Sequence, residues 1–537
     1  MNISAQIIKH LLKNPPQTEV DISRAKRKFC KDLKIKNIPN NSELLTELKK
    51  IPVGAYCNTP KKNTPLQNLL RKRSVRTLSG IAPIAVLTKP YPCPGACAYC
   101  PKEKDMPVSY LSNEPAVMRA ILCKFNPYKQ VQMRLQALQN NGHNTDKLEL
   151  IVMGGTWSYL PQTYQLWYIS ECFRAANDFP QNTKALKHLN TKTLWDELKK
   201  QQKKNESAKN RIIGLTLETR PDYINEEELK NMRQFGCTRI EIGIQHIDNK
   251  ILKLNKRGHT VEQTIEATNL MRQFGFKITY HIMPNLPGST PKKDLAMCKK
   301  IFSDPCFQPD QIKLYPCVVA RGSLLYHWWK QGKWKSYTTK ILINLLINIK
   351  SITPPWVRII RVIRDIPEES IIAGNKITNL RQVIQKKMDK NCKCIRCREA
   401  GRFHFNILTF KHFNKALNSL KLKIRKYKVI NGQEYFLSFE SKDEKILYAF
   451  CRLFLPSDNN TALIRELHTY GQVASLGQKG PIQHTGLGKK LLKQAEKNAL
   501  QKNYSKISII SGIGVRNYYR KLGYMLKNTY MVKKIAE

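Results

Sequence analysis

From residue 81 to residue 316, short apolar runs alternate with longer stretches whose apolar positions repeat at helical spacing. Short runs rich in Val, Ile and Leu are typical of buried strands. Strands that alternate with helices predict a parallel sheet built from right-handed strand–helix units. The runs lie at 81–89, 148–155, 211–218, 238–245, 277–284 and 311–316.

These six runs are fewer than the eight strands of a closed barrel. We therefore predict an α/β fold whose main part is an open (β/α)6 partial barrel over residues 76–335. Residues 1–75 show short helical patterns interrupted by Pro, with basic clusters at "RAKRKF" (24–29) and "RKRSVR" (71–76). This region is predicted to be a basic helical N-terminal module.

The rest of the chain divides into an insertion, a linker and a second domain. The segment 181–210 is rich in Lys, Asn and Gln, which predicts a solvated insertion with some helix. Residues 336–405 form a linker, in which "SITPPW" breaks any helix. Residues 406–537 predict an α/β domain, with strands at 435–455 and 461–469, a helix at 486–502 and a strand at 506–511.

Charge narrows the choice of partners. The chain has 92 basic and 40 acidic residues, a net charge of +52. Such a charge suits a polyanion, because Lys and Arg that neutralise phosphates release counterions. The alternative is a lysine-biased composition whose charges only solvate the surface.

Cysteine usage and hydropathy predict the compartment. The odd count of 15 cysteines argues against structural disulfides and favours a reducing cytosol. The N-terminus has charges and prolines where a signal peptide needs an apolar run. The longest apolar stretch, 341–349, is far shorter than the roughly 20 residues that span a bilayer. We expect a soluble, cytoplasmic protein without membrane contact.

Three cysteines, Cys93, Cys97 and Cys100, follow the first predicted strand in the stretch "CPGACAYC". A structural zinc ion takes four protein ligands, and iron–sulfur clusters are also usually held by four cysteines. With only three thiolates, one iron of a cubane stays open to a small-molecule ligand. The alternative is a zinc loop that borrows a distant ligand.

The spacing and position of this loop resemble those of the radical S-adenosylmethionine (radical SAM) enzymes. The resemblance implies a [4Fe–4S] cluster on these cysteines, whose open iron binds S-adenosylmethionine. It also implies that Tyr99 lies near the adenine. The turn "MGGT", with Gly154, Gly155 and Thr156, would contact the methionine amine. Three further polar residues end strands at the edge where such folds bind ligands, and each has the alternative of a structural ion pair: Glu218, Arg220 and Gln245.

A second motif lies near the C-terminus. The stretch 483–499 places Gln-x-x-Gly-x-Gly, with Gly486 and Gly488, at the start of a helix. Free amides at a helix N-terminus bind anions, and glycine lets a pyrophosphate approach. The motif resembles the acetyl-CoA loop of GNAT acetyltransferases, whereas the dinucleotide fingerprint has another glycine order. Downstream, Tyr518 and Tyr519 are candidates to donate a proton or hydrogen bond to the thioester, with ordinary aromatic packing as the alternative.

The two motifs on one chain resemble the catalytic subunit of Elongator and its stand-alone prokaryotic relatives. The resemblance extends over about residues 70–535. One departure is His246, which stands where relatives usually show Ser. The matching stretches include "VMGGT", "ETRPDYI", "GCTRIEIG", "RGHT", "IKLYP", "IRELH" and "ISGIGVRNYYRKLGY".

The resemblance implies a tRNA-modifying acyltransferase, a tRNA carboxymethyluridine synthase. A radical derived from S-adenosylmethionine would take hydrogen from the methyl group of acetyl-CoA. The carbon radical would add to carbon 5 of the wobble uridine, and thioester hydrolysis would leave 5-carboxymethyluridine. The expected partners are acetyl-CoA, a tRNA anticodon stem-loop and an electron donor, with the acetyl-CoA pocket beside the cluster.

The same resemblance assigns residues to substrates. Lys313 and Tyr315 are candidates to orient the substrate at the barrel mouth. We expect the two basic clusters and the 181–210 insertion to contact tRNA phosphates. The residues implied in acetyl-CoA binding are Lys147, Glu466, Leu467, His468, Gln483, His484 and Tyr519.

A second cysteine group, Cys392, Cys394 and Cys397, resembles a zinc-binding segment of prokaryotic members of the family. The spacing is tight enough for three thiolates on one ion. Cys317 or His404 would be the fourth ligand, and Cys317 is preferred because it would connect the barrel to the linker. The alternative is a reduced, metal-free group.

Two other functions compete with the tRNA-modifying enzyme. A protein lysine acetyltransferase with a structural iron–sulfur cluster would not need S-adenosylmethionine, and its activity would survive loss of Cys97. A non-enzymatic tRNA-binding scaffold would not hydrolyse acetyl-CoA when tRNA is added.

Overall fold

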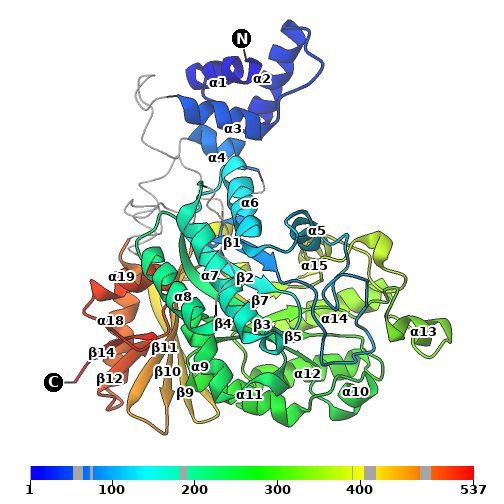
Figure 1. Ribbon diagram of the computed structural model, residues 1–537, viewed down its shortest axis with the longest axis vertical. Helices are drawn as coiled ribbons and strands as arrows, with labels where there is room; N and C mark the ends of the chain where they lie inside the picture. The colour runs from blue at the N-terminus through cyan, green and yellow to red at the C-terminus, as the bar shows by residue number, and fades with distance from the viewer. Residues whose placement is uncertain are drawn as a thin grey trace.

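A computed structural model of the chain describes residues 2–51, 65–72, 76–181, 190–389, 391–403, 419–471 and 485–536. A helical region stands at the top of Figure 1, above a parallel sheet wrapped by helices, and a second sheet lies at the lower left. The predicted α/β fold with an open partial barrel is confirmed.

The first sheet contains seven strands that are parallel and hydrogen-bonded in chain order. Each of the six predicted runs contains one strand, and the seventh strand was not predicted. The strands are β1 (Ala82–Leu87), β2 (Lys147–Met153), β3 (Arg211–Thr219), β4 (Arg239–Gln245), β5 (Lys277–Ile282), β6 (Gln311–Leu314) and β7 (Arg358–Arg361).

Strand β4 shows why these runs form a barrel wall. Its isoleucines, including Ile240 and Ile242, are fully buried in the core shared with the surrounding helices. Its alternate residues, Arg239 and Glu241, form ion pairs with Glu149 of β2 and with Lys313 of β6. Because successive side chains of a strand point to opposite faces, the helix-facing side is apolar and the barrel interior is polar.

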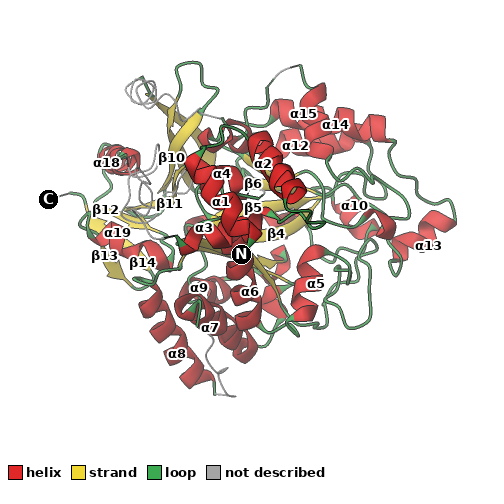
Figure 2. Ribbon diagram, turned by 90° about the horizontal axis from the view of Figure 1, so that it is seen from above, coloured by secondary structure: helices red, strands yellow, loops and turns green. Residues whose placement is uncertain are grey.

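Helices cover the outer face of the barrel sheet (Figure 2). Many begin at a capping side chain; Thr260 and Gln263, for example, form a capping box at the start of α11. Within the described chain, no helix combines the length and apolarity that a membrane crossing requires. The helices are α5 (Pro115–Leu122), α6 (Pro127–Asn140), α7 (Gln162–Asp178), α8 (Thr191–Asn205), α9 (Glu226–Gln234), α10 (Asn249–Leu254), α11 (Val261–Gln273), α12 (Pro291–Ser303), α13 (Leu324–Lys330), α14 (Thr339–Ile352), α15 (Leu380–Lys387) and α16 (Ile395–Arg398).

Helix α8 lies within the 181–210 segment, which was predicted to contain some helix, but the helix is packed rather than fully solvated. Leu194 and Leu198 are buried in the main core, so this helix is a packed layer with one solvated face. The buried side chain of Asn205 accepts a hydrogen bond from the backbone N–H of Ile212 in β3. The described lysines of the segment, between 192 and 209, are exposed, which is why its composition resembles that of a solvated insertion.

The N-terminal helices have a small core of their own, which includes Ile7, Ile8 and Leu44. They stand on the C-terminal end of α6, where the Ser42 hydroxyl donates to the Asn140 carbonyl at 2.8 Å. The predicted helical character of this region is confirmed. The helices are α1 (Ile3–Lys13), α2 (Glu19–Asp32), α3 (Asn41–Lys50) and α4 (Pro65–Leu70).

The second sheet is mixed and has the strand order β13-β14-β12-β11-β10-β9-β8. Helix α18 (Leu487–Leu500) packs against it, and the short α19 (Arg516–Arg520) leads into the last hairpin. The edge strand β8 was not predicted. The strands are β8 (Lys421–Val429), β9 (Gly432–Glu440), β10 (Leu447–Pro456), β11 (Thr461–Thr469), β12 (Lys506–Ile509), β13 (Met525–Lys527) and β14 (Tyr530–Lys534).

The second sheet docks against the N-terminal ends of the barrel strands through buried ion pairs. Asp310, directly before β6, pairs with Arg465 of β11, and Arg465 also pairs with Glu434. Lys277, the first residue of β5, lies 3.1 Å from Glu466 of β11. Paired buried charges tolerate little displacement, because an unpaired charge in such a place is costly.

Backbone-to-backbone contact tightens the same interface. A Cβ atom on Gly512 would lie 2.0 Å from the Ile213 carbonyl oxygen of β3. A Cβ on Gly514 would lie 2.6 Å from the Arg211 side chain. The glycines of "SGIG" therefore allow the C-terminal domain to lie directly against the start of β3.

Candidate active site

The C-terminal ends of the barrel strands bring together residues from four strands, and three of these residues have polar side chains. Thr88 follows β1, Gly154 follows β2, Glu218 lies near the end of β3, and Gln245 ends β4. Ligands bind at this edge of parallel strand–helix folds. The structure thus gathers at one edge several residues that the sequence indicated separately.

The cysteine loop follows β1 and is held from both sides by its backbone. The Ala98 N–H donates to the Asn255 carbonyl after α10 at 3.0 Å, and the Leu325 N–H of α13 donates to the Ala98 carbonyl at 2.7 Å. Gly95 lies against Arg220, and a Cβ there would be 2.3 Å from the guanidinium. The loop is therefore fixed between two helices and the end of β3.

Electrostatics around the loop favour thiolate at one cysteine. The Cys100 thiol and then the Arg257 guanidinium lower the pKa of Cys97 to about 5, against the opposing effect of burial. Arg257 donates to the Cys97 sulfur at 3.5 Å. Because iron binds thiolate rather than thiol, Cys97 is prepared for metal binding. Cys93 is half-buried, and its sulfur lies 3.5 Å from the Gly95 amide.

Buried polar atoms beside the loop have no hydrogen-bond partner among the described residues. They include the Thr88 hydroxyl, the Gln245 side-chain oxygen and one guanidinium nitrogen of Arg220. Native proteins rarely leave such atoms unpaired, because each loses its hydrogen bonds to water. Gln245 also has a left-handed backbone, with φ of 63°. These open groups next to three thiols fit a cluster and a polar ligand bound to it.

A small cavity lies directly at the end of β2. Gly154 and Gly155 have φ of 132° and 106°, which favours glycine at both positions. A Cβ on Gly154 would lie 1.9 Å from the Thr88 hydroxyl, so a side chain there would close the space. Thr156 follows directly. The cavity is lined by Thr88, Val152, Met153, Gly154, Gly155, Trp157, Leu160 and Glu218.

Lys313 is the centre of a charged network inside the barrel. Its ammonium pairs with Glu241 and lies 3.4 Å from Glu218. His281 lies 2.7 Å from Glu241, and the Tyr110 hydroxyl donates to Glu218 at 3.1 Å. Burial alone would lower the pKa of Lys313, but the two carboxylates raise it above its ordinary value. Lys313 is therefore a cation at neutral pH, held between two carboxylates.

Tyr315, the second candidate from "IKLYP", lies beside this network. Its ring is 5.4 Å from the His281 ring in an edge-on arrangement. Burial raises the pKa of Tyr315, so its hydroxyl keeps its proton at neutral pH and can donate a hydrogen bond.

The C-terminal motif forms a second site around the start of α18. Gly486 caps the helix with φ of 88°. A Cβ on Gly488 would lie 3.2 Å from the Tyr518 hydroxyl and 3.8 Å from Leu467 of β11. The structure therefore brings Gly488, Leu467 and Tyr518 together, with Gly486 two residues earlier at the start of the helix. Tyr519 is buried, and burial raises its pKa.

Other residues expected at acetyl-CoA have structural partners. The Glu466 carboxylate lies in the buried interface, where it pairs with Lys277 and Arg452. The His468 ring lies 2.8 Å from the Ser79 carbonyl and packs on Tyr470. Gln483 and His484 lie outside the described residues.

The structure separates the two sites, in contrast to the expectation that they are adjacent. Lys147 begins β2, and burial lowers its pKa to about 8. It therefore lies at the N-terminal edge of the barrel, as does the docked second sheet, whereas the cysteine loop lies at the C-terminal edge. The sequence does not reveal that β11 approaches the opposite ends of the strands.

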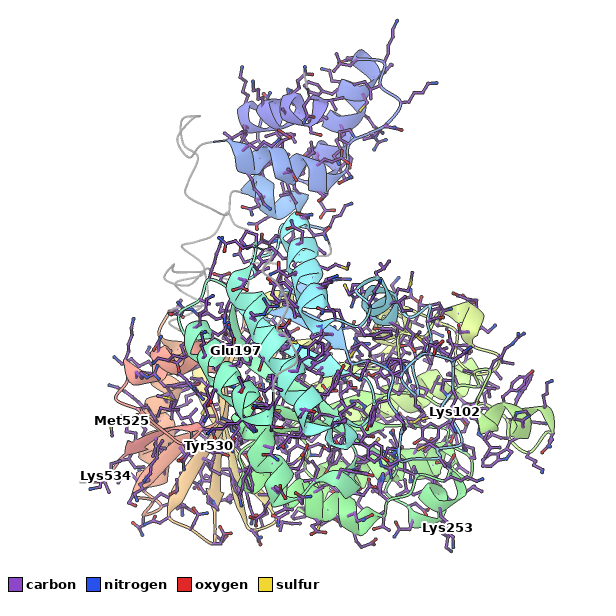
Figure 3. All side chains as sticks on the ribbon, viewed as in Figure 1. Lys102, Glu197, Lys253, Met525, Tyr530 and Lys534 are labelled. Carbon is purple, nitrogen blue, oxygen red and sulfur yellow. The ribbon has the colours of Figure 1, made fainter. Side chains whose placement is uncertain are left out.

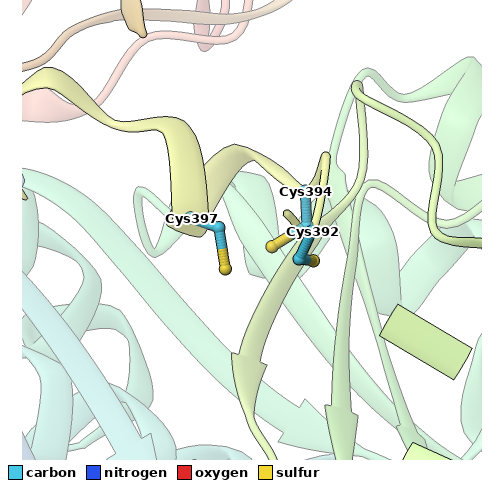
Figure 4. A group of neighbouring side chains, drawn as sticks. All are labelled: Cys392, Cys394 and Cys397. Atoms are coloured by element: carbon cyan, nitrogen blue, oxygen red, sulfur yellow. The ribbon is translucent and has the colours of Figure 1, made fainter. Parts of the chain in front are cut away.

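The second cysteine group converges on one point (Figure 4). The sulfur atoms of Cys392, Cys394 and Cys397 lie within 4.8 Å of one another, as thiolates on a single ion would. The Lys350 ammonium lies 3.5 Å from the Cys397 sulfur. Cys317 is not the fourth member, because it packs in another cluster with Tyr99. His404 lies outside the described residues.

The basic runs are only partly free for a partner. In "RAKRKF", Arg24, Arg27 and Lys28 are exposed, but Lys26 is buried and donates to Asn41 at 2.5 Å. In the second run, Arg71 donates to the Gly142 carbonyl at 3.0 Å and so fixes the N-terminal helices to the end of α6.

Sequence reasoning missed Thr88 and Arg257 as site residues. Arg257 lies in the quoted motif "RGHT", which was a usable signal. For Thr88, the only sequence signal is its position at the end of a predicted strand. Its role depends on contact with the end of β2, which no local pattern shows.

Comparisons with known proteins agree with this geometry. Residues 91–301 match the Radical SAM superfamily, and residues 309–390 match the Radical_SAM C-terminal domain. The superfamily implies a [4Fe–4S] cluster and S-adenosylmethionine, which the residues at the strand ends fit.

Similar proteins cover almost the whole chain. A Methanocaldococcus infernus protein named tRNA uridine(34) acetyltransferase is 42% identical over 93% of this chain and 92% of its own. Elongator complex protein 3 of Schizosaccharomyces pombe is 35% identical over 98% of this chain and 97% of its own. A solved structure of the archaeal Methanocaldococcus infernus Elp3 matches with a TM-score of 0.72 and 39% identity, covering 85% of this chain and 100% of that one. The chain belongs to the family of the Elongator catalytic subunit.

Proposed function

We propose that this protein modifies the wobble uridine of tRNA, using the acetyl group of acetyl-CoA to form 5-carboxymethyluridine by radical SAM chemistry. The observation that carries the proposal is the presence of two distinct sites on one barrel. The thiols and unpaired polar atoms lie at one edge, and the glycine-started helix α18 lies on the domain docked at the other. Relatives named tRNA uridine(34) acetyltransferase support the choice of substrate.

The chain's own residues have separate tasks at the first site. When bound, the cluster and S-adenosylmethionine supply a carbon radical that abstracts hydrogen. Arg257 stabilises thiolate at Cys97. The open polar atoms of Thr88, Gln245 and Arg220 bind and orient the ligand. The buried barrel excludes water, which prevents side reactions.

The interior network and the second site act on the other reactants. The Lys313 ammonium is positioned to bind a substrate oxygen, because Glu218 and Glu241 fix its place and charge. At the second site, the amides at the start of α18 attract the pyrophosphate of acetyl-CoA. The Tyr518 hydroxyl, next to Gly488, donates to the thioester oxygen.

We also propose that Cys392, Cys394 and Cys397 bind zinc. Their close sulfurs support one shared ion, and Cys394 is fully buried. Because α16 follows the barrel strand β7 and precedes the second sheet, the ion would stabilise the connection between the two.

Anaerobic reconstitution with iron and sulfide tests the function. The full-length protein is incubated with S-adenosylmethionine, acetyl-CoA, tRNA and dithionite, and the tRNA nucleosides are analysed by mass spectrometry. We expect 5-carboxymethyluridine from the native chain and none from Cys97→Ala. The variant Cys306→Ala, which changes a half-buried cysteine elsewhere, is the matched control.

The alternative of a lysine acetyltransferase gives a different result. Acetyl transfer to a peptide amine that survives in Cys97→Ala, without modified uridine from the native chain, would overturn the proposal. Cleavage of S-adenosylmethionine without tRNA modification would retain the radical site and reject the assigned substrate.

A further inference from the structure

The charged network around Lys313 contains an imidazole, that of His281, which has no task in the reaction described so far. His281 lies in β5, where Ile278 and Ile282 are fully buried in the core on the helix side. Because alternate residues of a strand point to opposite faces, His281 points into the barrel. Its side chain is 16% exposed, whereas that of its partner Glu241 is fully buried. The ring therefore lies on the open side of the network, at the C-terminal end of its strand.

Glu241 fixes the orientation of the imidazole and the position of its proton. It accepts a hydrogen bond from Nε2–H of His281, with the nitrogen and oxygen 2.7 Å apart. The same carboxylate has two cations as partners, Lys313 and Arg239, so a neutral ring is sufficient as its third partner. In a neutral imidazole with the proton on Nε2, Nδ1 has a free lone pair. This Nδ1 makes no hydrogen bond to any residue that the structure describes. A carboxylate behind an imidazole whose second nitrogen is open is the arrangement of a general base.

His281 lies next to the residues that receive the ligand and the substrate. One of its ring nitrogens lies within 4.8 Å of a carboxylate oxygen of Glu218. Glu218 also lines the cavity at Gly154, at the end of β2. The His281 ring and the Lys313 ammonium contact the same oxygen of Glu241. A substrate carbonyl bound to Lys313 therefore brings its neighbouring atoms to the imidazole.

We propose that His281 is the general base that removes the proton from carbon 5 of the uracil ring after the carbon radical has added there. This inference rests on the proposed function. Addition forms the new C–C bond at carbon 5 and leaves an unpaired electron on carbon 6. The C5–H bond then breaks, its proton goes to Nδ1 of His281, and its electron pair restores the double bond between carbons 5 and 6. The unpaired electron returns to the oxidised iron–sulfur cluster. No external oxidant is consumed, because one electron was taken from the cluster when S-adenosylmethionine was cleaved.

The other polar groups of the network are less suited to accept this proton. Lys313 is a cation and has only donors. Burial raises the pKa of Tyr315, so its hydroxyl keeps its own proton at neutral pH. The two oxygens of Glu218 already have partners, the Lys313 ammonium and the Tyr110 hydroxyl. Among the side chains described here, Nδ1 of His281 is the open acceptor on the exposed side of the network.

The tyrosines of the second site do not reach this position. Figure 3 shows Lys102, which follows the cysteine loop, on one side of the molecule, and Met525 and Lys534 of the second sheet on the other. Tyr518 lies in α19, directly before the hairpin that contains these two residues. Its domain docks against the N-terminal ends of the barrel strands, whereas His281 lies near the C-terminal end of β5. The proton acceptor for carbon 5 therefore comes from the barrel itself.

The test substitution is His281→Gln in the full-length, cluster-loaded protein. The amide nitrogen of the new side chain takes the place of Nε2 and still donates to Glu241, but the side chain has no basic nitrogen. His327→Gln makes the same change at an exposed position of α13 and is the matched control. Anaerobic reactions with S-adenosylmethionine, acetyl-CoA, tRNA and dithionite are analysed for both 5′-deoxyadenosine and the modified nucleoside. A parallel set uses tRNA with deuterium at carbon 5 of the wobble uridine.

We expect His281→Gln to form the modified nucleoside about 100-fold more slowly, the lower end of what a positioned general base contributes. Cleavage of S-adenosylmethionine should continue near the native rate, so that 5′-deoxyadenosine exceeds the nucleoside product. Deuterium at carbon 5 should slow the variant more than the native protein, because removal of this proton becomes the slow step. Anticodon stem-loop binding, measured by fluorescence anisotropy, and thermal unfolding of the metal-free protein should not change, since the base acts after binding.

A second variant separates the chemistry of the ring from its packing. His281→Ala removes the imidazole and leaves space in its place. Imidazole added to the buffer should restore part of the nucleoside formation in this variant, because it supplies the missing basic nitrogen. It should restore none in Cys97→Ala, which lacks a cluster ligand rather than a base.

Several results would overturn the role of His281. Equal loss of 5′-deoxyadenosine and of the modified nucleoside in His281→Gln would show that the residue supports the cofactor or the fold. A native rate of nucleoside formation, an isotope effect of native size, or an equal loss in His327→Gln would also reject it. Failure of the proposed function gives a different result, because the native protein itself would then form no 5-carboxymethyluridine. If the native protein forms that nucleoside and His281→Gln forms it equally fast, the function stands and only the assignment of the base fails.

Discussion

The two ends of the barrel strands differ in whether their buried polar groups have partners. At the C-terminal ends, atoms of Thr88, Gln245 and Arg220 are buried without partners among the described residues. At the N-terminal ends, Asp310 and Lys277 each pair with an opposite charge on β11. One end is therefore built to receive a ligand, and the other is built to hold a domain permanently.

This contrast separates two kinds of polar chemistry on a single sheet. A buried polar atom with no partner lowers the stability of the empty protein and becomes useful only when a ligand supplies the bond. A buried charge with a partner fixes geometry and loses much if the partner is removed. Substitutions at the two ends should thus affect different measurements, binding at one end and unfolding at the other.

The largest expected effect is on activity at the ligand end. Cys97→Ala should lower S-adenosylmethionine cleavage by at least about 1,000-fold, roughly 4 kcal/mol in the barrier, because one thiolate of the cluster is lost. The midpoint of thermal unfolding of the metal-free protein should change little. A variant that retains iron and cleavage activity would contradict the assignment of the ligand end.

The next effect is on stability at the docking end. Asp310→Ala removes the buried carboxylate that Arg465 and Arg452 share and leaves them only Glu434 and Glu466. It should destabilise the fold by about 3–5 kcal/mol, measured by denaturant unfolding. Asp443→Ala removes an exposed pair and should cost less than about 1 kcal/mol. Equal effects from the two substitutions would mean that the interface charges have no special role.

Acid should loosen the docking end first. Burial alone would raise the pKa of Glu466, but Lys277 and Arg452 hold it at about 2, and neighbouring arginines likewise hold the pKa of Asp310 at about 2. Their stabilisation is complete above the ordinary carboxyl pKa and is lost as pH falls from about 4.5 toward 2, on the order of 2 kcal/mol for each group. The free energy of unfolding measured between pH 6 and pH 2 should show this loss of stability. Glu466→Gln should reduce the slope of that free energy against pH.

The smallest expected effect is at a single hydroxyl of the ligand end. Thr88→Val keeps the shape but removes the unpaired hydroxyl, so it should weaken S-adenosylmethionine binding by about threefold to tenfold, near 1 kcal/mol. Stability of the empty protein should be unchanged or slightly higher. Isothermal titration of the reconstituted protein measures the affinity, and a large loss of stability without a change in affinity would show that Thr88 is structural.

Local patterns predicted most of the fold, and the exceptions have physical reasons. Strand β7 is only four residues long and follows "TPPW", so its sequence indicates a break, and only pairing with β6 makes it a strand. Strand β8 alternates Lys with apolar residues at an exposed edge, where lysine discourages further pairing. Both strands depend on neighbours in the sheet more than on their own composition.

The functional site also divides into features that the local sequence predicts and features that depend on contacts between distant segments. The cysteine loop and the glycine turn could be found from the sequence, because their spacing and their places after predicted strands resemble those of a known enzyme family. The pairing of Lys313 with Glu241 and of Arg257 with Cys97 could not, since these partners meet only when separate strands and loops come together. For the same reason, the sequence did not reveal that Glu466 belongs to the interface.

The ion pairs that hold the second sheet against the barrel also keep the two sites at opposite ends of the barrel strands. Strand β2 contains seven residues between its Lys147 end and its Met153 end, which corresponds to about 23 Å of extended chain. If neither domain can swing toward the other, a flexible reactant has to cross that span by itself. For the proposed function, a long, jointed carrier such as the pantetheine arm of acetyl-CoA would suit this architecture, and a short acyl donor would stop before the far end.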